Sequence, residues 1–383
     1  MFNSKRFLLG FFLASIFASI FYLVIYLLLL QVGEVNLDKV VKKQLINKRV
    51  LYVSGINQST YQYKIKLFDT TQPEIVTIGS SRAMQVRNQF FNKSFINLGG
   101  INNVAELESM ITELVSRKQK PKLVLVFIDP WWVNKDFAGN GGITPLSNPS
   151  QFSLPLAISA ISTLRQGNWL TKMLSSDNLG IHSILTDEGF SHDGSYHYTT
   201  TLSGQRPTED QNFSNTLWRI SNSNARFNKA DTPDSKLVSR MCSALQKLDA
   251  NFEHVVVIAP PFSSIVWKSM AKGGYEYIDT TNNEIAKCIG SDKFHSFVSG
   301  DNIPENTDCE FIDGFHGGDV TYARVISIVA TKDAHVHRYT DSSYLDQFIN
   351  ENSGLAGGTT MRLFGIKEID FLMLGCVKTS HRL

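Results

Sequence analysis

An uninterrupted apolar segment at residues 7–30 constrains this chain more than any other feature of its sequence. The segment contains no charged residue. As a helix rising about 1.5 Å per residue it would span roughly 36 Å, enough to cross a hydrocarbon core of about 30 Å. A cleaved signal peptide and a buried core helix are the alternatives. A signal h-region is shorter, no small-x-small cleavage motif follows residue 30, and a core helix rarely lacks a polar face for so long. We therefore expect one uncleaved signal anchor.

The charged residues that flank this segment leave its orientation open. Lys5 and Arg6 precede it and favour an internal N-terminus. The basic residues that follow it favour the opposite orientation; they are Lys39, Lys42, Lys43, Lys48 and Arg49. Long domains are translocated despite flanking charge, so the chemistry of the domain has to decide.

The composition is that of a globular protein. Of all residues, 43% are hydrophobic and 19% charged, and 37 Lys+Arg against 35 Asp+Glu leave a net charge of +2. A disordered chain would be rich in charge and poor in aromatic residues, and a nucleic-acid binder usually has a basic excess. We expect neither class, and no nucleic-acid partner. A polytopic transporter is excluded because only one segment is apolar enough to span a bilayer.

After residue 70, buried-strand patterns alternate with helical patterns. The expected strands are residues 74–78, 94–98, 122–128 and 254–259, and the expected helices are residues 103–118, 235–248 and 320–330. Strands that are apolar throughout and separated by helices indicate a parallel sheet with helices on both faces. The expected fold class is therefore α/β: a three-layer sandwich with a mostly parallel, flavodoxin-like sheet, preceded by one transmembrane helix.

The same patterns suggest how the chain is divided. Residues 137–232 are rich in Asn, Ser, Gly, Thr and Asp, with weak periodicity. We interpret them as a long insertion with short helices, such as residues 154–164, because structureless loops of this length are rare in compact domains. The expected segments are a cytoplasmic N-terminus (1–6), the span (7–30), a stalk and lead-in (31–70), the domain with its insertion (71–335) and a C-terminal segment (336–383).

A Gly-Ser-Ser-Arg sequence ends the first expected strand, at Gly79 to Arg82. The carboxyl ends of parallel strands are where α/β sheets present reactive groups. A helix starting there would direct N–H groups at Ser81, which suits a nucleophile whose intermediate carries an oxyanion. Serine is also a common helix N-cap, so the motif alone permits a purely structural interpretation. Arg82 binds an anionic group of the substrate or forms a surface salt bridge.

The next two strand ends also carry marked residues. Gly99 offers an N–H donor close to a neighbouring site, or fills a turn that needs positive φ. After the third strand come Asp129, a proline, the pair Trp131 and Trp132, and Asn134. The tryptophans wall a substrate pocket or simply cover the end of the sheet.

Asp313 and His316 lie three residues apart, in a turn before the last expected helix. At this spacing a carboxylate can fix the imidazole tautomer and stabilise its cation, as in a Ser-His-Asp triad. The alternative is an Asx-turn that caps the helix, with an incidental histidine.

In this order, the four motifs resemble the SGNH (GDSL-like) hydrolase superfamily. The resemblance implies that Ser81 is the nucleophile, His316 its base and Asp313 the residue that orients the base. It implies an oxyanion hole formed by the N–H groups of Ser81 and Gly99. Ser80 stands where this superfamily usually has aspartate, and the usual Gly-x-Asn-Asp string is absent, so Asn134 or Asp129 takes its place.

A single membrane-anchored domain of this kind is similar to alginate O-acetyltransferase and teichoic-acid D-alanylation accessory proteins. That similarity implies a single-pass protein of the cytoplasmic (inner) membrane with a periplasmic catalytic domain. It implies O-acetylation of a cell-surface or exported polysaccharide, with a multi-span membrane acyltransferase as a partner. Two alternatives stay open: an anchored carbohydrate esterase or deacetylase, and a non-catalytic scaffold that binds a glycan, which the missing third motif favours.

The sequence supports three further predictions, on a loop, on metal binding and on the cysteines. Residues 189–198 form a lid or substrate-facing loop that carries His192 and Tyr196, or an ordinary solvated loop. No metal and no cofactor are expected, because the histidines lack partners at ligand spacing. Cys288 and Cys309 flank the stretch before Asp313; they form a disulfide that stiffens this loop in an oxidising compartment, or they are buried thiols.

Overall fold

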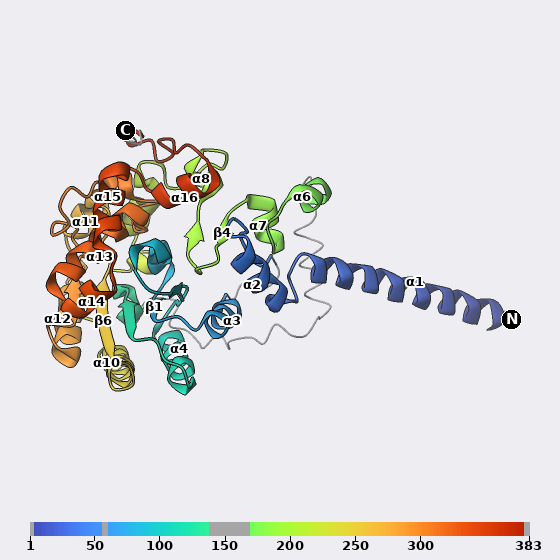
Figure 1. Cartoon of the computed structure of the whole chain (residues 1–383), viewed down its shortest axis with the longest axis horizontal. Helices are drawn as coiled ribbons and strands as arrows, with labels where there is room; N and C mark the ends of the chain where they lie inside the picture. Colours follow the sequence, from blue (N-terminus) through green and yellow to red (C-terminus); the bar gives the residue numbers. More distant parts are fainter. Residues whose placement is uncertain (1–3, 56–59, 138–168, 379–383) are drawn as a thin grey trace.

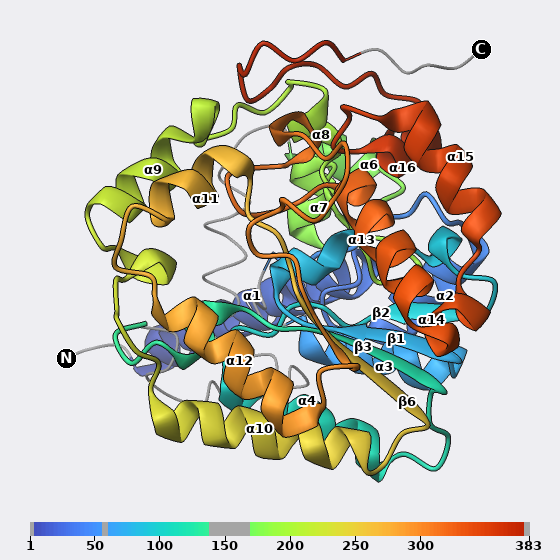
Figure 2. The same cartoon turned by 90° about the vertical axis from the view of Figure 1, so that its left-hand side faces the viewer.

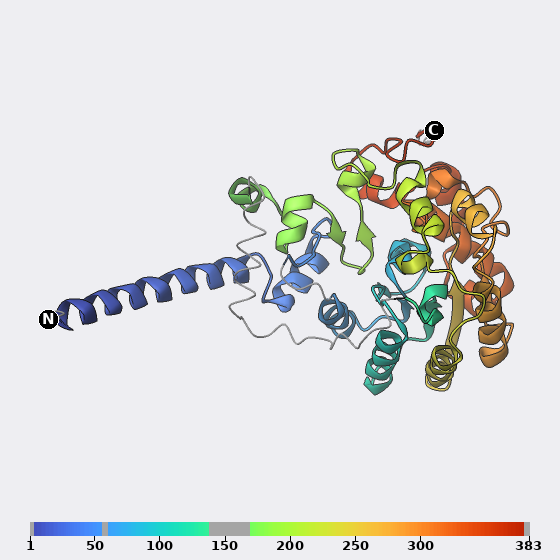
Figure 3. The same cartoon turned by 180° about the vertical axis from the view of Figure 1, so that it is seen from behind.

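The computed structural model describes residues 4–55, 60–137 and 169–378. Helix α1 (Ser4–Gln31) extends away from the rest of the molecule (Figures 1 and 3). Within the described ranges, its residues Phe7–Gln31 form the one helix long and apolar enough to cross a membrane, with a mean hydropathy of 2.5. The expected apolar helix is therefore confirmed, and its insertion in a membrane stays a prediction. The predicted helix at residues 154–164 lies outside the described residues.

A five-stranded parallel sheet forms the centre of the domain, in the order β2-β1-β3-β6-β7. Its strands are β1 (Ile75–Ile78), β2 (Phe95–Asn97), β3 (Leu123–Phe127), β6 (His254–Ala259) and β7 (Phe294–Ser296). The first four are the predicted strands, so the predicted α/β class with a parallel sheet is confirmed. A separate antiparallel hairpin joins β4 (Gly189–Phe190) to β5 (Tyr196–His197).

Helices make up most of the remaining described chain. The predicted helices are confirmed as α4 (Val104–Ser116), α10 (Ser235–Asp249) and α13 (Asp319–Lys332). The other α-helices are α2 (Leu37–Ile46), α3 (Tyr61–Thr71), α6 (Trp169–Ser175), α7 (Ile181–Thr186), α8 (Thr199–Leu202), α9 (Ser214–Ser221), α11 (Ser264–Met270), α12 (Tyr277–Ile289), α14 (Ala334–Tyr339), α15 (Ser342–Asn352) and α16 (Gly358–Phe364). Short 3₁₀ helices are η1 (Ser81–Gln85), η2 (Asn88–Phe90), η3 (Pro130–Val133), η5 (Gln211–Phe213), η6 (Ala225–Phe227) and η7 (Asp308–Glu310).

The strands bury both of their faces, in two separate hydrophobic cores. Val124 and Val126 of β3 enter a core shared with α3, α4, α10 and α12, whereas Leu123 and Leu125 enter one shared with α13, α14 and α15. Figure 2 shows α4, α10 and α12 on one side of the strands and α13 to α15 on the other. Burial of both faces explains why the strand sequences are apolar throughout instead of alternating.

The junction between α1 and the domain is fixed by packing and by hydrogen bonds. Leu29 and Val32 at the end of α1 pack against Ile181 and Ile184 of α7. The buried Glu34 carboxylate accepts hydrogen bonds from the N–H groups of Gly55 (2.9 Å) and Ile181 (2.5 Å). Residues 31–70, expected as a stalk, contribute α2 and α3 to the first core. The apolar helix therefore joins the domain without a loose linker.

Candidate active site

The turn after β1 places a serine at the carboxyl edge of the sheet, and Gly79 makes this turn possible. A Cβ atom at residue 79 would lie 2.7 Å from the Phe127 carbonyl oxygen and 2.9 Å from the Ala83 Cβ. Only glycine lets the chain turn this close to the end of β3. Ser81 then begins η1, with its side chain partly exposed.

The two serines of this turn have different roles. The Ser80 hydroxyl accepts a hydrogen bond from the Arg82 N–H (3.0 Å), so Ser80 is the N-cap of η1. The Ser81 Oγ lies 2.7 Å from the Nε2 atom of His316. The helix expected after Ser81 is a 3₁₀ helix of five residues, so the structure does not provide the α-helix N-terminus that we expected to face the nucleophile.

Asp313 completes a hydrogen-bonded relay with Ser81 and His316. Its Oδ2 lies 2.7 Å from His316 Nδ1, and its Oδ1 accepts the N–H groups of Phe315 (2.9 Å) and His316 (2.8 Å). Burial acts to raise the pKa of Asp313, but the His316 ring and these N–H donors outweigh it and hold the pKa below its usual range. An ionised Asp313 accepts a hydrogen bond from the Nδ1–H group of His316, which leaves Nε2 free to accept the hydroxyl proton of Ser81. The relay reaches the surface, because the His316 and Asp313 side chains are 13% and 23% exposed.

The loop that carries Asp313 and His316 is held from several sides. The Ile312 N–H donates to the His316 carbonyl (2.8 Å), and the Gly318 N–H donates to the Glu310 carbonyl (2.7 Å). From the insertion, Asp210 accepts the N–H of Gly314 (2.9 Å). These bonds fix the loop backbone, so the imidazole faces Ser81 without a rearrangement.

Neither interpretation that the sequence allowed for Arg82 is correct. Its side chain is fully buried, so it neither binds substrate directly nor forms a surface salt bridge. Its guanidinium contacts Asp129 Oδ1 (3.1 Å) and donates to the carbonyls of Pro260 (2.8 Å) and Pro261 (2.7 Å). Its Nε donates to the carbonyl of Phe315 (2.9 Å). One side chain thus ties the end of β1 to the ends of β3 and β6 and to the residue next to His316.

The predicted oxyanion hole is supported only at Ser81. Within the described chain, no hydrogen bond occupies the Ser81 N–H. The Gly99 N–H donates to the Asn97 side chain instead (2.8 Å). The Asn134 side chain donates to the Asn228 carbonyl (2.7 Å) and accepts the Asp136 N–H (3.0 Å), which closes the turn after η3. Gly99 and Asn134 are therefore corrected from oxyanion donors to residues that shape the neighbouring turns.

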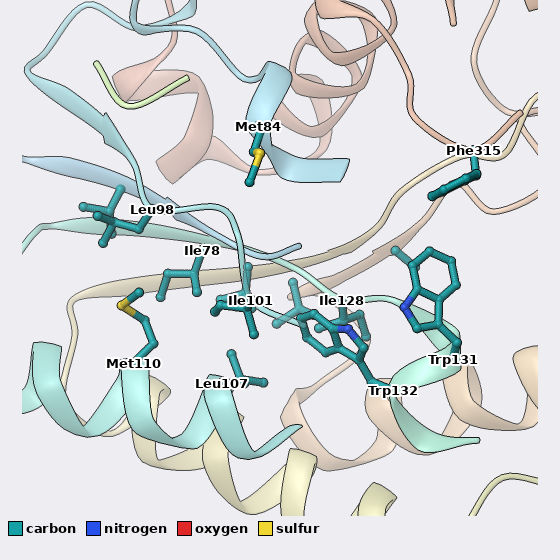
Figure 4. Close-up of a cluster of buried hydrophobic side chains, with 14 of the residues drawn as sticks. Ile78, Met84, Leu98, Ile101, Leu107, Met110, Ile128, Trp131, Trp132 and Phe315 are labelled. Atoms are coloured by element: carbon teal, nitrogen blue, oxygen red, sulfur yellow. The ribbon is translucent and has the colours of Figure 1, made fainter. Parts of the chain in front are cut away.

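The paired tryptophans belong to the core and do not line a substrate surface. Trp131 is 2% exposed and Trp132 is fully buried. Figure 4 shows both within the cluster of buried side chains above α4, with Phe315 beside Trp131. The Trp131 ring meets the Phe315 ring edge to face, with centroids 6.0 Å apart. Stacking of these indoles on a sugar is excluded in this structure, and Trp131 instead supports the loop that carries His316.

The β4–β5 hairpin also differs from the expectation. Both ring nitrogens of His192 are buried, although the residue as a whole is partly exposed, so its polar atoms do not reach the surface. The Tyr196 ring packs between Phe190 and Tyr198, at centroid distances of 5.1 and 4.7 Å. Burial is the main cause that raises the pKa of the Tyr198 hydroxyl. The nearby Tyr196 and Asp313 raise this pKa further. Tyr198, which follows the hairpin, is therefore close to the candidate site, and a substrate-facing role for this loop stays a prediction.

The cysteines form two disulfides, and neither is the predicted pair. Cys242 bonds Cys288, which joins α10 to α12, and Cys309 bonds Cys376. The predicted bond between Cys288 and Cys309 is wrong because Cys288 lies on α12, which packs against α10 and brings it to Cys242. Cys309 nevertheless links the start of the loop that carries Asp313 and His316 to the C-terminal tail.

The two disulfides give a prediction with a built-in control. Replacing Cys309 and Cys376 by serine should lower both the melting temperature and ester turnover, because that bond holds the loop of Asp313 and His316. Replacing Cys242 and Cys288 should lower stability by a similar amount, about 2–5 kcal/mol, with a smaller effect on turnover. Urea unfolding and ester kinetics on the two double variants test this. Equal losses of turnover after correction for the folded fraction would contradict it.

Among the described residues, no group of three or more His, Cys, Asp or Glu side chains is arranged to hold a metal ion. No family model matches the chain, and no curated protein or solved structure matches it. The functional interpretation therefore depends on the motifs and on the geometry of the Ser81–His316–Asp313 relay.

Proposed function

We propose that this chain is a membrane-anchored serine acyltransferase of SGNH type, which O-acetylates a cell-surface or exported polysaccharide. The observation that carries the proposal is the continuous relay from Ser81 Oγ through His316 to Asp313, with both hydrogen bonds at 2.7 Å. Its three residues come from the end of β1 and from a loop more than two hundred positions later, at the carboxyl edge where α/β sheets place reactive groups.

The relay supports a two-step acyl transfer. Ser81 Oγ attacks the carbonyl carbon of an ester donor while its proton passes to His316 Nε2, and the donor alcohol leaves with that proton. In this mechanism the N–H of Ser81 donates to the oxyanion. In the second step a sugar hydroxyl attacks the acyl-serine and gives its proton to Nε2. The acylated sugar leaves and Ser81 recovers the proton, with the ionised Asp313 stabilising the imidazolium in both steps.

Two features support an extracytoplasmic domain anchored in the cytoplasmic membrane. Cys242–Cys288 and Cys309–Cys376 are both bonded, and such disulfides persist in oxidising compartments. The exposed apolar helix α1 passes directly into the domain and serves as the proposed signal anchor. The two-sided helical cover of the sheet agrees with the proposed three-layer SGNH architecture.

The fate of the acyl group distinguishes the transferase from the esterase and from the glycan-binding scaffold. Full-length protein in detergent micelles is incubated with a neutral aryl acetate and a hydroxyl-bearing oligosaccharide, and the sugar is analysed by mass spectrometry. Acetylated oligosaccharide supports the transferase. Release of acetate alone, with or without sugar, would establish the esterase alternative. No turnover of several aryl acetates would leave the glycan-binding scaffold as the remaining hypothesis.

A further inference from the structure

A partly buried arginine without a counter-ion lies beside the proposed active site. Arg226 belongs to η6, in the insertion, and its guanidinium carbon lies 5.6 Å from the centre of the Phe315 ring. The Phe315 ring in turn lies 4.1 Å from the His316 ring, measured between centroids. One aromatic ring therefore contacts both the guanidinium and the catalytic imidazole.

Arg226 differs from the other buried arginines in having no acidic partner. Arg82 pairs with Asp129, Arg87 with Asp319 and Arg324 with Glu310; these six residues are all buried. Within the described chain, neither Arg226 nor the neighbouring Arg219 forms an ion pair or a side-chain hydrogen bond. Even partial burial of an unpaired charge costs free energy, so this guanidinium is suited to bind an anionic ligand.

The backbone around Arg226 is shaped to hold it in place. Phe227, the next residue, is fully buried against Phe315, and the Tyr275 hydroxyl donates to the Phe227 carbonyl (2.6 Å). Ser223 and Ala225, just before Arg226, adopt φ of +49° and +55°, a region that residues with side chains rarely enter. Such strained positions persist where the surrounding structure determines them, and they concentrate at functional sites.

The electrostatic surroundings agree with an anionic ligand. Burial acts to lower the pKa of Arg226, and Arg219 lowers it further, whereas Asp129 and Asp313 act to raise it. Arginine stays protonated in such surroundings. Asp129 is bonded to Arg82 and Asp313 to His316, so neither carboxylate neutralises Arg226 by direct contact. A guanidinium presents parallel N–H donors that match the two oxygens of a carboxylate or phosphate.

We propose that Arg226, assisted by Arg219, forms a subsite that binds an oxyanion of the substrate, a carboxylate or a phosphate, next to Ser81. This inference rests on the proposed acyl transfer and adds to it that the substrate is anionic. The subsite holds the negative group at Arg226, which contacts the same Phe315 ring as His316, so that an adjacent ester or hydroxyl meets the nucleophile.

The test compares aryl acetates that carry a charged or a neutral group para to the acetyl ester. The probes are 4-acetoxybenzoate and 4-acetoxyphenyl phosphate, with methyl 4-acetoxybenzoate as the neutral counterpart. Full-length wild-type protein should show a higher kcat/KM for at least one anionic ester than for the neutral one. Arg226→Gln should reduce that preference about tenfold or more, chiefly through KM, the loss expected for one charge-assisted hydrogen-bonded pair. Arg226→Lys should keep part of it, because the charge stays.

A control variant and a binding measurement separate the two proposals. Lys118→Gln removes one exposed charge beyond the end of α4, away from the carboxyl edge, and should keep the preference for anionic esters. Calorimetry on Ser81→Ala protein measures binding of the same esters without turnover. If Ser81→Ala and Ser81→Ala/Arg226→Gln bind charged and neutral esters alike, the subsite is refuted. Absence of turnover in wild type, with tighter binding of the anionic ester, would refute the acyl transfer and keep the subsite.

Discussion

Ser81→Ala protein is expected to lose ester turnover by a factor of up to about 10⁶, the loss found when a triad nucleophile is removed. Among the described residues, the Ser81 hydroxyl is the one that forms a hydrogen bond with the His316 ring, and the adjacent Ser80 hydroxyl caps η1 instead. A serine-directed fluorophosphonate should therefore label wild-type protein and fail to label Ser81→Ala. Labelling that persists in this variant would overturn the assignment of the nucleophile.

Ser80→Ala is the matched control for this experiment. It removes one hydroxyl from the adjacent position and costs the cap of η1, about 1 kcal/mol, but it keeps the Ser81–His316 pair. The Ser80→Ala protein should still be labelled. His316→Ala and Asp313→Asn should each abolish most turnover, and combining either with Ser81→Ala should add little, since the three residues act as one unit. Additive losses would argue against a relay.

The sequence predicted the relay because its signals are local. A serine after a buried strand and an aspartate three residues before a histidine each mark a turn, and parallel strands bring such turns to one edge. The side chains that support the relay left no comparable signal. Arg82 has four partners from three distant segments, so nothing in its own neighbourhood indicated that it would be buried.

The same distinction explains the other errors. Trp131 and Trp132 were ambiguous because an aromatic pair at a strand end looks alike whether it faces a ligand or the core. The disulfides depend on which helices pack together, and spacing along the chain does not reveal that α10 lies against α12. Strand β7 was missed because its three residues, Phe294–Ser296, are only half buried and too short to show a pattern. Arg226 was missed because it lies in the insertion, where periodicity is weak.

Residues of the insertion also hold the loop that carries His316. Asp210 holds Gly314 through its carboxylate, and it fixes α9 by accepting the N–H (2.8 Å) and hydroxyl (2.7 Å) of Thr216. A Cβ atom at Gly314 would lie 2.8 Å from Thr216, so insertion and catalytic loop pack without space for a side chain. The segment that looked least regular in sequence therefore determines the position of His316.

Arg82→Met is expected to lower the free energy of unfolding by about 3–5 kcal/mol, the cost of leaving one member of a buried ion pair alone. Arg82 and Asp129 are both completely or almost completely buried, and the guanidinium also satisfies three carbonyl oxygens. Arg82→Lys keeps the charge but cannot reach all four acceptors, so its loss should be intermediate. Urea unfolding measures these changes. The surface pair of Arg240 and Glu108 is the control, and Arg240→Met should cost at most about 1 kcal/mol.

The pH dependence of stability tests whether the unpaired Asp129 carboxylate causes the loss of stability in Arg82→Met. Burial raises the pKa of Asp129, and Arg82 is the main group that opposes this shift. Without Arg82, the folded protein favours the protonated Asp129 more strongly than the unfolded chain does, so stability rises as pH falls through the folded-state pKa. The gap in stability between Arg82→Met and Arg82→Met/Asp129→Asn should therefore shrink toward acidic pH. If this gap in stability stays constant from pH 8 to the lowest pH at which the protein folds, the charge of Asp129 is not the cause of the loss. The lost contacts with the carbonyl oxygens would then be the reason that Arg82 is indispensable to the edge of the sheet where Ser81 meets His316.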